Sequence, residues 1–130
     1  MSSDPKRTIV ATDTAPGAIG PYSQAVKTDT TLYVSGQLAL DPASGELVDH
    51  EIQAETRQAM ENLKAILIAA GSGLDKVVKT TLFIKNMDDF PKINEVYAAY
   101  FQADPPARAC VEVARLPKDA NFEIEPVAQL

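Results

Sequence analysis

The charged side chains best placed for chemistry lie near the C-terminal end of the chain, and Arg108 is the first of them. Arg108 follows Pro105, Pro106 and Ala107, and this stiff entry to an expected strand holds its backbone in a defined place. Its planar guanidinium could then bind a carboxylate through two parallel hydrogen bonds. The alternative is an ordinary solvated arginine, which the local sequence by itself does not exclude.

Glu123 and Glu125 are the carboxylates that could position water or move a proton beside such a substrate. They are two residues apart in an expected strand, so their side chains point to the same side. The local pattern therefore does not choose between them. Either could also be an outward-facing, solvated strand residue.

Metal and nucleotide chemistry are disfavoured by the residues that the chain offers. Zinc and iron sites need clusters of His, Cys or carboxylate ligands, and the chain has one histidine, His50, and one cysteine, Cys110. A Cys–His nucleophilic pair is formally possible, but nothing in the expected places of these two residues brings them together. Gly-rich phosphate-binding motifs are absent from the sequence. We expect no metal and no cofactor.

The composition is that of one ordinary globular domain spanning residues 1–130, with 45% hydrophobic and 23% charged residues. The net charge of -6 repels the phosphate backbone that dominates nucleic-acid affinity, so a nucleic-acid partner is disfavoured. The first residues contain no apolar stretch typical of a signal peptide, and no segment approaches the length of a membrane span. We expect a soluble, cytoplasmic protein without a membrane partner.

The elements that must position these side chains follow from periodicity and turn signals. Apolar residues at three- and four-residue steps predict an amphipathic helix over residues 51–70, ended by Gly71. A second helix is expected from an N-cap at Asp88 to no later than residue 104. Strands are expected over residues 7–12, 22–27, 31–36, 76–85, 107–113 and 121–127. This order predicts an α+β fold in which two helices pack on one face of a mixed sheet.

The other face of that sheet would carry apolar side chains without a helix to cover them. Such a face must meet a partner or stay exposed, so we expect a homo-oligomer. Symmetry alone would make a dimer the default.

Four separated segments of the chain resemble the reactive-intermediate deaminase family, also called the RidA or YjgF family, and together they extend over essentially the whole chain. The segments are residues 18–24 (AIGPYSQ), 33–37 (YVSGQ), 77–85 (VVKTTLFIK) and 106–124 (PARACVEVARLPKDANFEI). The resemblance implies a single-domain chorismate-mutase-like (YjgF-type) subunit, assembled as a homotrimer with active sites between neighbouring subunits.

The resemblance also assigns roles to individual residues. It implies that Arg108 binds the substrate carboxylate and that Glu123, in preference to Glu125, positions the water. The positions that it implies for the pocket wall are Tyr22, Ser35, Gly36, Asn94 and Cys110. Two departures from the family pattern are Phe122, where a branched aliphatic residue is usual, and Pro126, whose missing N–H predicts an edge strand or a strand end. These two residues bear on pocket size and on the pairing of the last strand.

The activity implied by the resemblance is hydrolytic deamination without a cofactor. Its substrates are 2-aminoacrylate, 2-aminocrotonate and their 2-imino acid tautomers, and its products are 2-keto acids and ammonia. The chain would then be a 2-iminobutanoate/2-iminopropanoate deaminase. Two alternatives stay open: a non-catalytic trimer that binds 2-keto acids or acts like a chaperone, and an RNA-cleaving inhibitor of translation.

Overall fold

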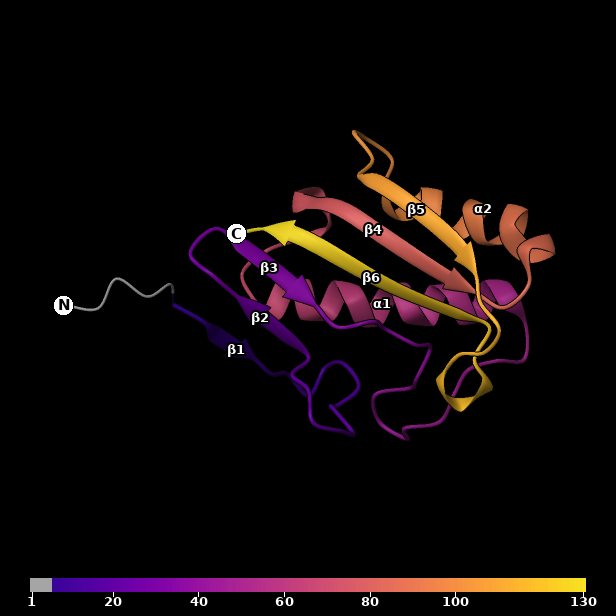
Figure 1. Ribbon diagram of the computed structural model, residues 1–130, viewed down its shortest axis with the longest axis horizontal. Coiled ribbons are helices and arrows are strands. Elements are labelled where there is room, and N and C mark those ends of the chain that lie inside the picture. The colour runs from indigo at the N-terminus through magenta and orange to yellow at the C-terminus, as the bar shows by residue number, and fades with distance from the viewer. Residues whose placement is uncertain (1–5) are drawn as a thin grey trace.

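A mixed β-sheet forms the centre of the computed structural model, which describes residues 6–130 (Figure 1). Within that range the sheet has six strands in the order β1-β2-β3-β6-β4-β5. They are β1 (Thr8–Val10), β2 (Ala25–Lys27), β3 (Thr31–Val34), β4 (Val77–Ile84), β5 (Ala107–Glu112) and β6 (Phe122–Gln129). β4 and β5 are parallel, whereas the other neighbouring strands are antiparallel. The expected hairpin of β2 with β3 and the central place of β4 are confirmed.

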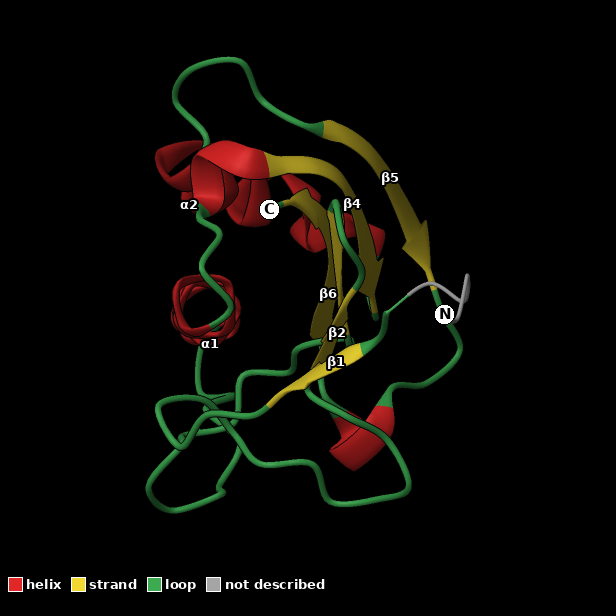
Figure 2. Ribbon diagram, turned by 90° about the vertical axis from the view of Figure 1, so that its left-hand side faces the viewer, coloured by secondary structure: helices red, strands yellow, loops and turns green. Residues whose placement is uncertain are grey.

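The helices α1 (Ile52–Ala69) and α2 (Phe90–Tyr100) lie on the same face of this sheet, as Figure 2 shows. Three short 3-10 turns complete the described part of the chain: η1 (Leu74–Lys76), η2 (Met87–Asp89) and η3 (Pro117–Asp119). The predicted α+β architecture with two helices on one face of a mixed sheet is confirmed.

The helix α1 follows its sequence signals closely. The Glu51 carboxylate accepts hydrogen bonds from the backbone N–H groups of Gln53 (2.7 Å) and Ala54 (3.1 Å), which satisfies two of the free donors at the helix start. Gly71 ends the helix with φ of +83°, a conformation that residues with a Cβ rarely adopt. The apolar stripe of α1 is fully buried from Ala59 to Leu67, with Leu63 at its centre.

The start of α2 corrects the expected N-cap at Asp88. The N-cap of α2 is Asp89, which makes no side-chain capping hydrogen bond, and Asn86 caps the preceding turn η2, where its side-chain oxygen accepts the backbone N–H of Asp88 at 2.9 Å. That contact opens the turn η2, which runs directly into α2, so Asp88 lies inside the turn. Asn and Asp cap helices about equally well, so residue type alone does not separate Asn86, Asp88 and Asp89.

The last strand corrects the expectation for Pro126. β6 continues through Pro126 to Gln129 and lies between β3 and β4, not at an edge. The N–H of Ile124 points to the β3 side, where it donates to the carbonyl of Gln37, so the nitrogen of Pro126, two residues later, points there as well. Pairing with β3 is interrupted there, between Tyr33↔Val127 and Gln37↔Ile124. The missing donor therefore falls in a gap of the ladder.

The sheet separates a packed face from an open one. Phe122 points to the helices and is fully buried in the core, so this departure from the family pattern does not line the space beside Glu123. On the open face Ile9, Tyr33 and Val111 are 52%, 53% and 42% exposed. The expected uncovered apolar face is thus present.

No helix within residues 6–130 combines the length and apolarity that crossing a bilayer requires. The expectation that the first residues are not a signal peptide falls partly on residues 1–5, which lie outside the described residues.

Candidate active site

Glu123 forms one wall of a cleft of about 480 Å³. The other walls come from the loop before β2, the segment after β3 and the turn η3. Three of the expected pocket residues, Tyr22, Ser35 and Gly36, line this cleft together with Glu123. Tyr22 lies outside β2, which begins at Ala25 and not at residue 22 as expected. The fold therefore gathers four of the expected site residues in one place.

Two glutamines that the sequence reasoning did not select hold these walls in position. Gln24 is buried, and its amide nitrogen donates to the carbonyls of Pro16 (2.8 Å) and Thr12 (3.0 Å), which ties the preceding loop to β2. Gln37 exchanges backbone hydrogen bonds of 2.7 and 3.1 Å with Ile124. Gln24 ends the motif AIGPYSQ and Gln37 ends the motif YVSGQ. Their places in these two motifs were the available signal.

Gly36 gives the Glu123 carboxylate its place. A Cβ added to Gly36 would lie 2.8 Å from Oε2 and 2.9 Å from Cδ of Glu123, closer than side chains tolerate. The carboxylate thus packs directly on the backbone of residue 36. The antiparallel pairing of Gln37 with Ile124 sets this approach, because it places Gly36 opposite Glu125 and makes Glu123, two residues earlier on the same side of β6, its diagonal neighbour.

The surroundings of Glu123 raise the pKa of its carboxyl above the ordinary value of 4.5. Partial burial is the larger cause, and the nearby charge of Glu125 is the second. Among the hydrogen bonds of residues 6–130, none reaches this carboxylate. A carboxylate that is poorly solvated and whose pKa is raised is better suited to take a proton from water near neutral pH.

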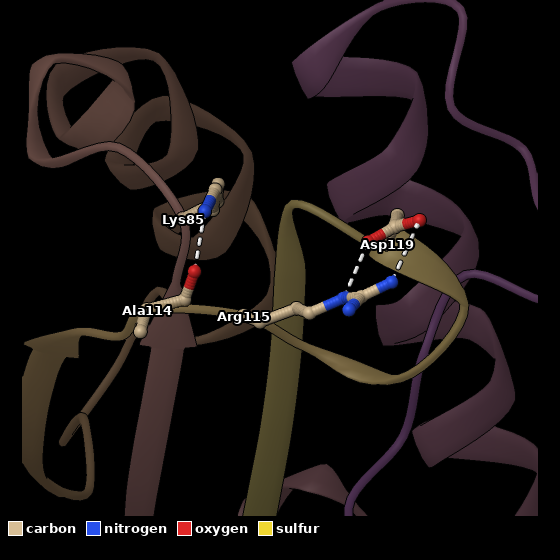
Figure 3. A network of polar contacts seen from close by, with 4 residues as sticks. All are labelled: Lys85, Ala114, Arg115 and Asp119. Atoms are coloured by element: carbon tan, nitrogen blue, oxygen red, sulfur yellow. Dashed lines mark hydrogen bonds and ion pairs between the residues drawn. The ribbon is translucent and has the colours of Figure 1, made fainter.

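The connection from β5 to β6 carries Lys118 to the rim of this cleft. Lys118 and Asp119 have φ of +58° and +54°, which is uncommon for residues other than glycine. Arg115 donates from Nε to Oδ1 of Asp119 at 2.8 Å, and Lys85 donates to the carbonyl of Ala114, as Figure 3 shows. The ion pair spans the turn but is largely exposed, so it contributes little to holding it.

A buried carboxylate fixes the end of the same connection. Glu55 of α1 is fully buried, and its two oxygens accept the backbone N–H (2.7 Å) and side-chain Nδ2 (2.9 Å) of Asn121. Asn121 precedes Glu123 by two residues, so α1 sets where β6 begins. The sequence showed no signal for this contact, which joins residues 66 positions apart.

Arg108 belongs to a second group of residues, built on β5 and α2. Its Nη1 donates to Oδ1 of Asn94 at 2.7 Å. Its guanidinium carbon lies 5.1 Å from the ring centre of Phe90 and 4.9 Å from that of Tyr97. Arg108 is exposed at the edge of the sheet, so the N–H groups not used by Asn94 are open to a ligand. This arrangement suits a carboxylate.

Cys110 lies two residues beyond Arg108 and shares its side of β5. Burial raises the pKa of the Cys110 thiol, and the positive charge of Arg108 opposes this only in part. A thiol whose pKa is raised stays protonated at neutral pH and is a poor nucleophile. The structure therefore favours a wall position for Cys110 over a reactive one.

Arg108 and Glu123 lie on opposite faces of the sheet. Arg108 pairs with Thr80, which is buried under the helices, whereas Glu123 pairs with Phe83, whose side chain points to the open face. Directly paired residues point to the same side, and residues an odd number apart on β4 point to opposite sides. A single copy of the chain therefore does not bring the two expected catalytic side chains together.

His50 is exposed and lies just before α1. No group of three or more His, Cys, Asp or Glu side chains suited to a metal ion occurs among the described residues. Cys110 faces the α2 side of β5, in another part of the fold.

Comparison with known proteins places nearly the whole chain in one family. The sequence model of a family described as Endoribonuclease L-PSP matches residues 12–130. A RutC family protein of Pyrococcus horikoshii is 52% identical over 120 residues, which cover 92% of this chain and 95% of that protein. The 2-iminobutanoate/2-iminopropanoate deaminase of Homo sapiens is 50% identical over 122 residues, covering 94% and 89% of the two chains. The crystal structure of Escherichia coli TdcF with bound serine superposes with a TM-score of 0.91 at 45% identity, covering 95% and 98%.

Proposed function

The chain belongs to the endoribonuclease L-PSP family, also called the RidA or YjgF family, and on that premise we propose that it is a hydrolytic deaminase of reactive imino acids. The observation that carries the proposal is that the chain presents two groups of residues, each suited to one half of such a site. One presents a guanidinium with free donors, as a small carboxylic acid requires, and the other presents a half-buried glutamate in a cleft. Relatives about half identical to this chain are named for the same activity.

The active site in this proposal is shared between copies of the chain. Residues 1–130 form one domain, and three copies assemble with their open apolar faces together. Arg108, Asn94 and Cys110 of one subunit then face Glu123 and Tyr22 of its neighbour. Such an assembly would cover the exposed Val111 and Tyr33, and it would resolve the separation of Arg108 and Glu123 within one subunit.

The reaction is addition of water to a C=N bond, followed by loss of ammonia. An enamine such as 2-aminoacrylate first tautomerises to 2-iminopropanoate, and Arg108 holds its carboxylate so that C2 faces Glu123. Glu123 takes a proton from water as the oxygen adds to C2. The protonated glutamic acid then returns that proton to the nitrogen of the carbinolamine. As the C–N bond breaks, the hydroxyl proton passes to the Glu123 carboxylate and from there to solvent, so that ammonia and a 2-keto acid leave. The positive charge of the protonated imine already makes C2 electrophilic, so positioning supplies much of the rate.

RNA cleavage is the alternative function that the description of the family suggests. The net charge of -6 opposes it, because phosphate backbones are repelled by such a field. The cleft is lined by two carboxylates, Glu123 and Glu125, and by one basic side chain, Lys118. Nuclease activity that stays with the protein through a second column, and that falls steeply with salt, would favour this rival.

The test is a coupled assay in which a dehydratase generates 2-aminocrotonate or 2-aminoacrylate and semicarbazide traps the imine. The protein is expected to speed keto-acid formation in competition with the trap, and Arg108→Ala is expected to abolish the effect while the fold persists. Binding of 2-oxobutanoate by a folded oligomer without any acceleration would support the non-catalytic alternative.

Mixing two inactive variants tests whether the site is shared. Arg108→Ala and Glu123→Gln lose opposite halves of it, so randomly mixed trimers should regain about a quarter of the wild-type sites. If both residues served one site from the same subunit, the mixture would stay inactive. Refolding each variant alone is the control.

A further inference from the structure

We infer that Tyr97 and Phe90 are positioning residues, which hold the Arg108 guanidinium in the orientation that the substrate carboxylate needs. The inference rests on the proposed function, because it assigns how the carboxylate-binding half of that site is built. It concerns residues that touch Arg108 and not the reacting atoms.

The two rings contact the guanidinium directly. Its central carbon lies 4.9 Å from the ring centre of Tyr97 and 5.1 Å from that of Phe90, within the range at which an aromatic face attracts a cation. Asn94 accepts one N–H of Nη1. The rings use no N–H group of the arginine, so its remaining donors stay free for a carboxylate. Contacts of three kinds of side chain thus restrict the arginine without occupying its binding edge.

Tyr97 is itself firmly held, which makes it a fixed support. Its hydroxyl forms a 2.8 Å hydrogen bond with the Thr80 hydroxyl, and both residues are buried. The ring of Phe101 packs against it with centroids 4.9 Å apart and planes tilted by 49°. Thr80 also pairs with Arg108 across β4 and β5. The strand that carries the arginine and the ring beneath it are therefore anchored to the same residue.

Without these rings, Arg108 would be a long side chain at the exposed edge of the sheet. Such a side chain samples many rotamers, and binding a ligand would have to order it. The contacts with α2 order it in advance. Removal of one ring should therefore weaken carboxylate binding about threefold to tenfold, from the lost attraction and the added disorder.

The experiment measures binding of 2-oxobutanoate to the whole oligomer by calorimetry, beside KM and kcat in the coupled assay. Tyr97→Leu and Phe90→Leu should raise Kd and KM by that factor. Tyr97→Phe keeps the ring and should lie between wild type and Tyr97→Leu. The matched control is Tyr100→Leu, which removes a ring of the same helix that hydrogen-bonds Glu61 of α1 and lies outside the two ring contacts of Arg108, so Kd should stay within about twofold.

A second measurement needs no substrate. ¹⁵N relaxation of the Arg108 Nε–H in the ligand-free protein should report a restricted group in wild type and a mobile one in Tyr97→Leu. Folded ring variants with unchanged Kd and an equally restricted Nε–H would overturn the inference. The proposed function would instead be refuted if wild type failed to bind 2-oxobutanoate, or if Arg108→Ala bound it equally well. The relaxation result would still decide whether the rings hold the arginine.

Discussion

Gly36→Ala should reduce turnover by moving one carboxylate, while leaving the fold intact. The new Cβ would lie 2.8 Å from Oε2 of Glu123, and ordinary contact begins near 3.4 Å, so the carboxylate must shift by roughly 0.6 Å. Misplacement by about 1 Å in an active site costs about 100-fold in rate. We therefore expect kcat to fall about 10- to 100-fold. KM should change less, because Arg108 binds the carboxylate.

Stability should hardly change in the same variant. The clashing atoms lie at the end of a flexible side chain, and the φ of Gly36 is not in the left-handed region. Replacing glycine by alanine reduces the conformational freedom of the unfolded chain, which favours the folded state by about 0.4 to 1 kcal/mol. We expect the free energy of unfolding to change by less than about 1 kcal/mol.

The assay is the coupled deaminase reaction, with chemical denaturation measured in parallel. Gly17→Ala is the matched control, because Gly17 lines the same cleft and a Cβ there would meet nothing within 4 Å. Unchanged turnover in Gly36→Ala would refute the role given to the position of Glu123. An equal loss in both variants would show that the cleft tolerates no added methyl group, and that the contact with Glu123 is not the cause.

Three further predictions concern charge and packing. The acidic limb of the pH–rate profile should lie above pH 4.5. Glu125→Gln should move that limb to lower pH, because the charge of Glu125 raises the pKa of Glu123. A limb that stays in place would contradict this coupling. Glu123→Gln should be more stable than wild type at pH 7. The pKa of Glu123 is raised in the folded state, so ionising this carboxyl destabilises the folded state as pH rises from 4.5 through that pKa. Denaturation at pH 7 and at pH 4 should show this gain and its loss, and equal stabilities at both would contradict it. In α1, Leu63→Ala should lower the free energy of unfolding by about 2 to 5 kcal/mol. Ile68→Ala, 61% exposed on the same helix, should change it by about 0.5 kcal/mol or less.

Local patterns in the sequence were sufficient for the class of fold. The three- and four-residue spacing of apolar side chains placed α1 and its end at Gly71, because a helix is stabilised by contacts between near neighbours along the chain. The strand β4 was recognisable as a central one from its continuous apolar run. These features repeat within a few residues, so no partner segment is needed to recognise them.

Errors arose where a residue's role depends on what lies across from it. Asp88 is a good cap by type, but a 3-10 turn capped by Asn86 precedes α2, so the helix begins after Asp89. Pro126 predicts an edge by its missing donor, but a gap in the neighbouring ladder lets it sit in a central strand. Phe122 is a core residue because its side of β6 faces the helices.

The sequence by itself determined which chemical groups the chain offers: a guanidinium at position 108, two glutamates near its end, and motifs that resemble one family. The tertiary structure decided where they point. Alternation along a strand is a local property, whereas the relation between β5 and β6 depends on their registers with β4, which no local pattern encodes. Those registers place Arg108 and Glu123 on opposite faces, and the approach of Gly36 to Glu123 likewise exists only once the strands have paired.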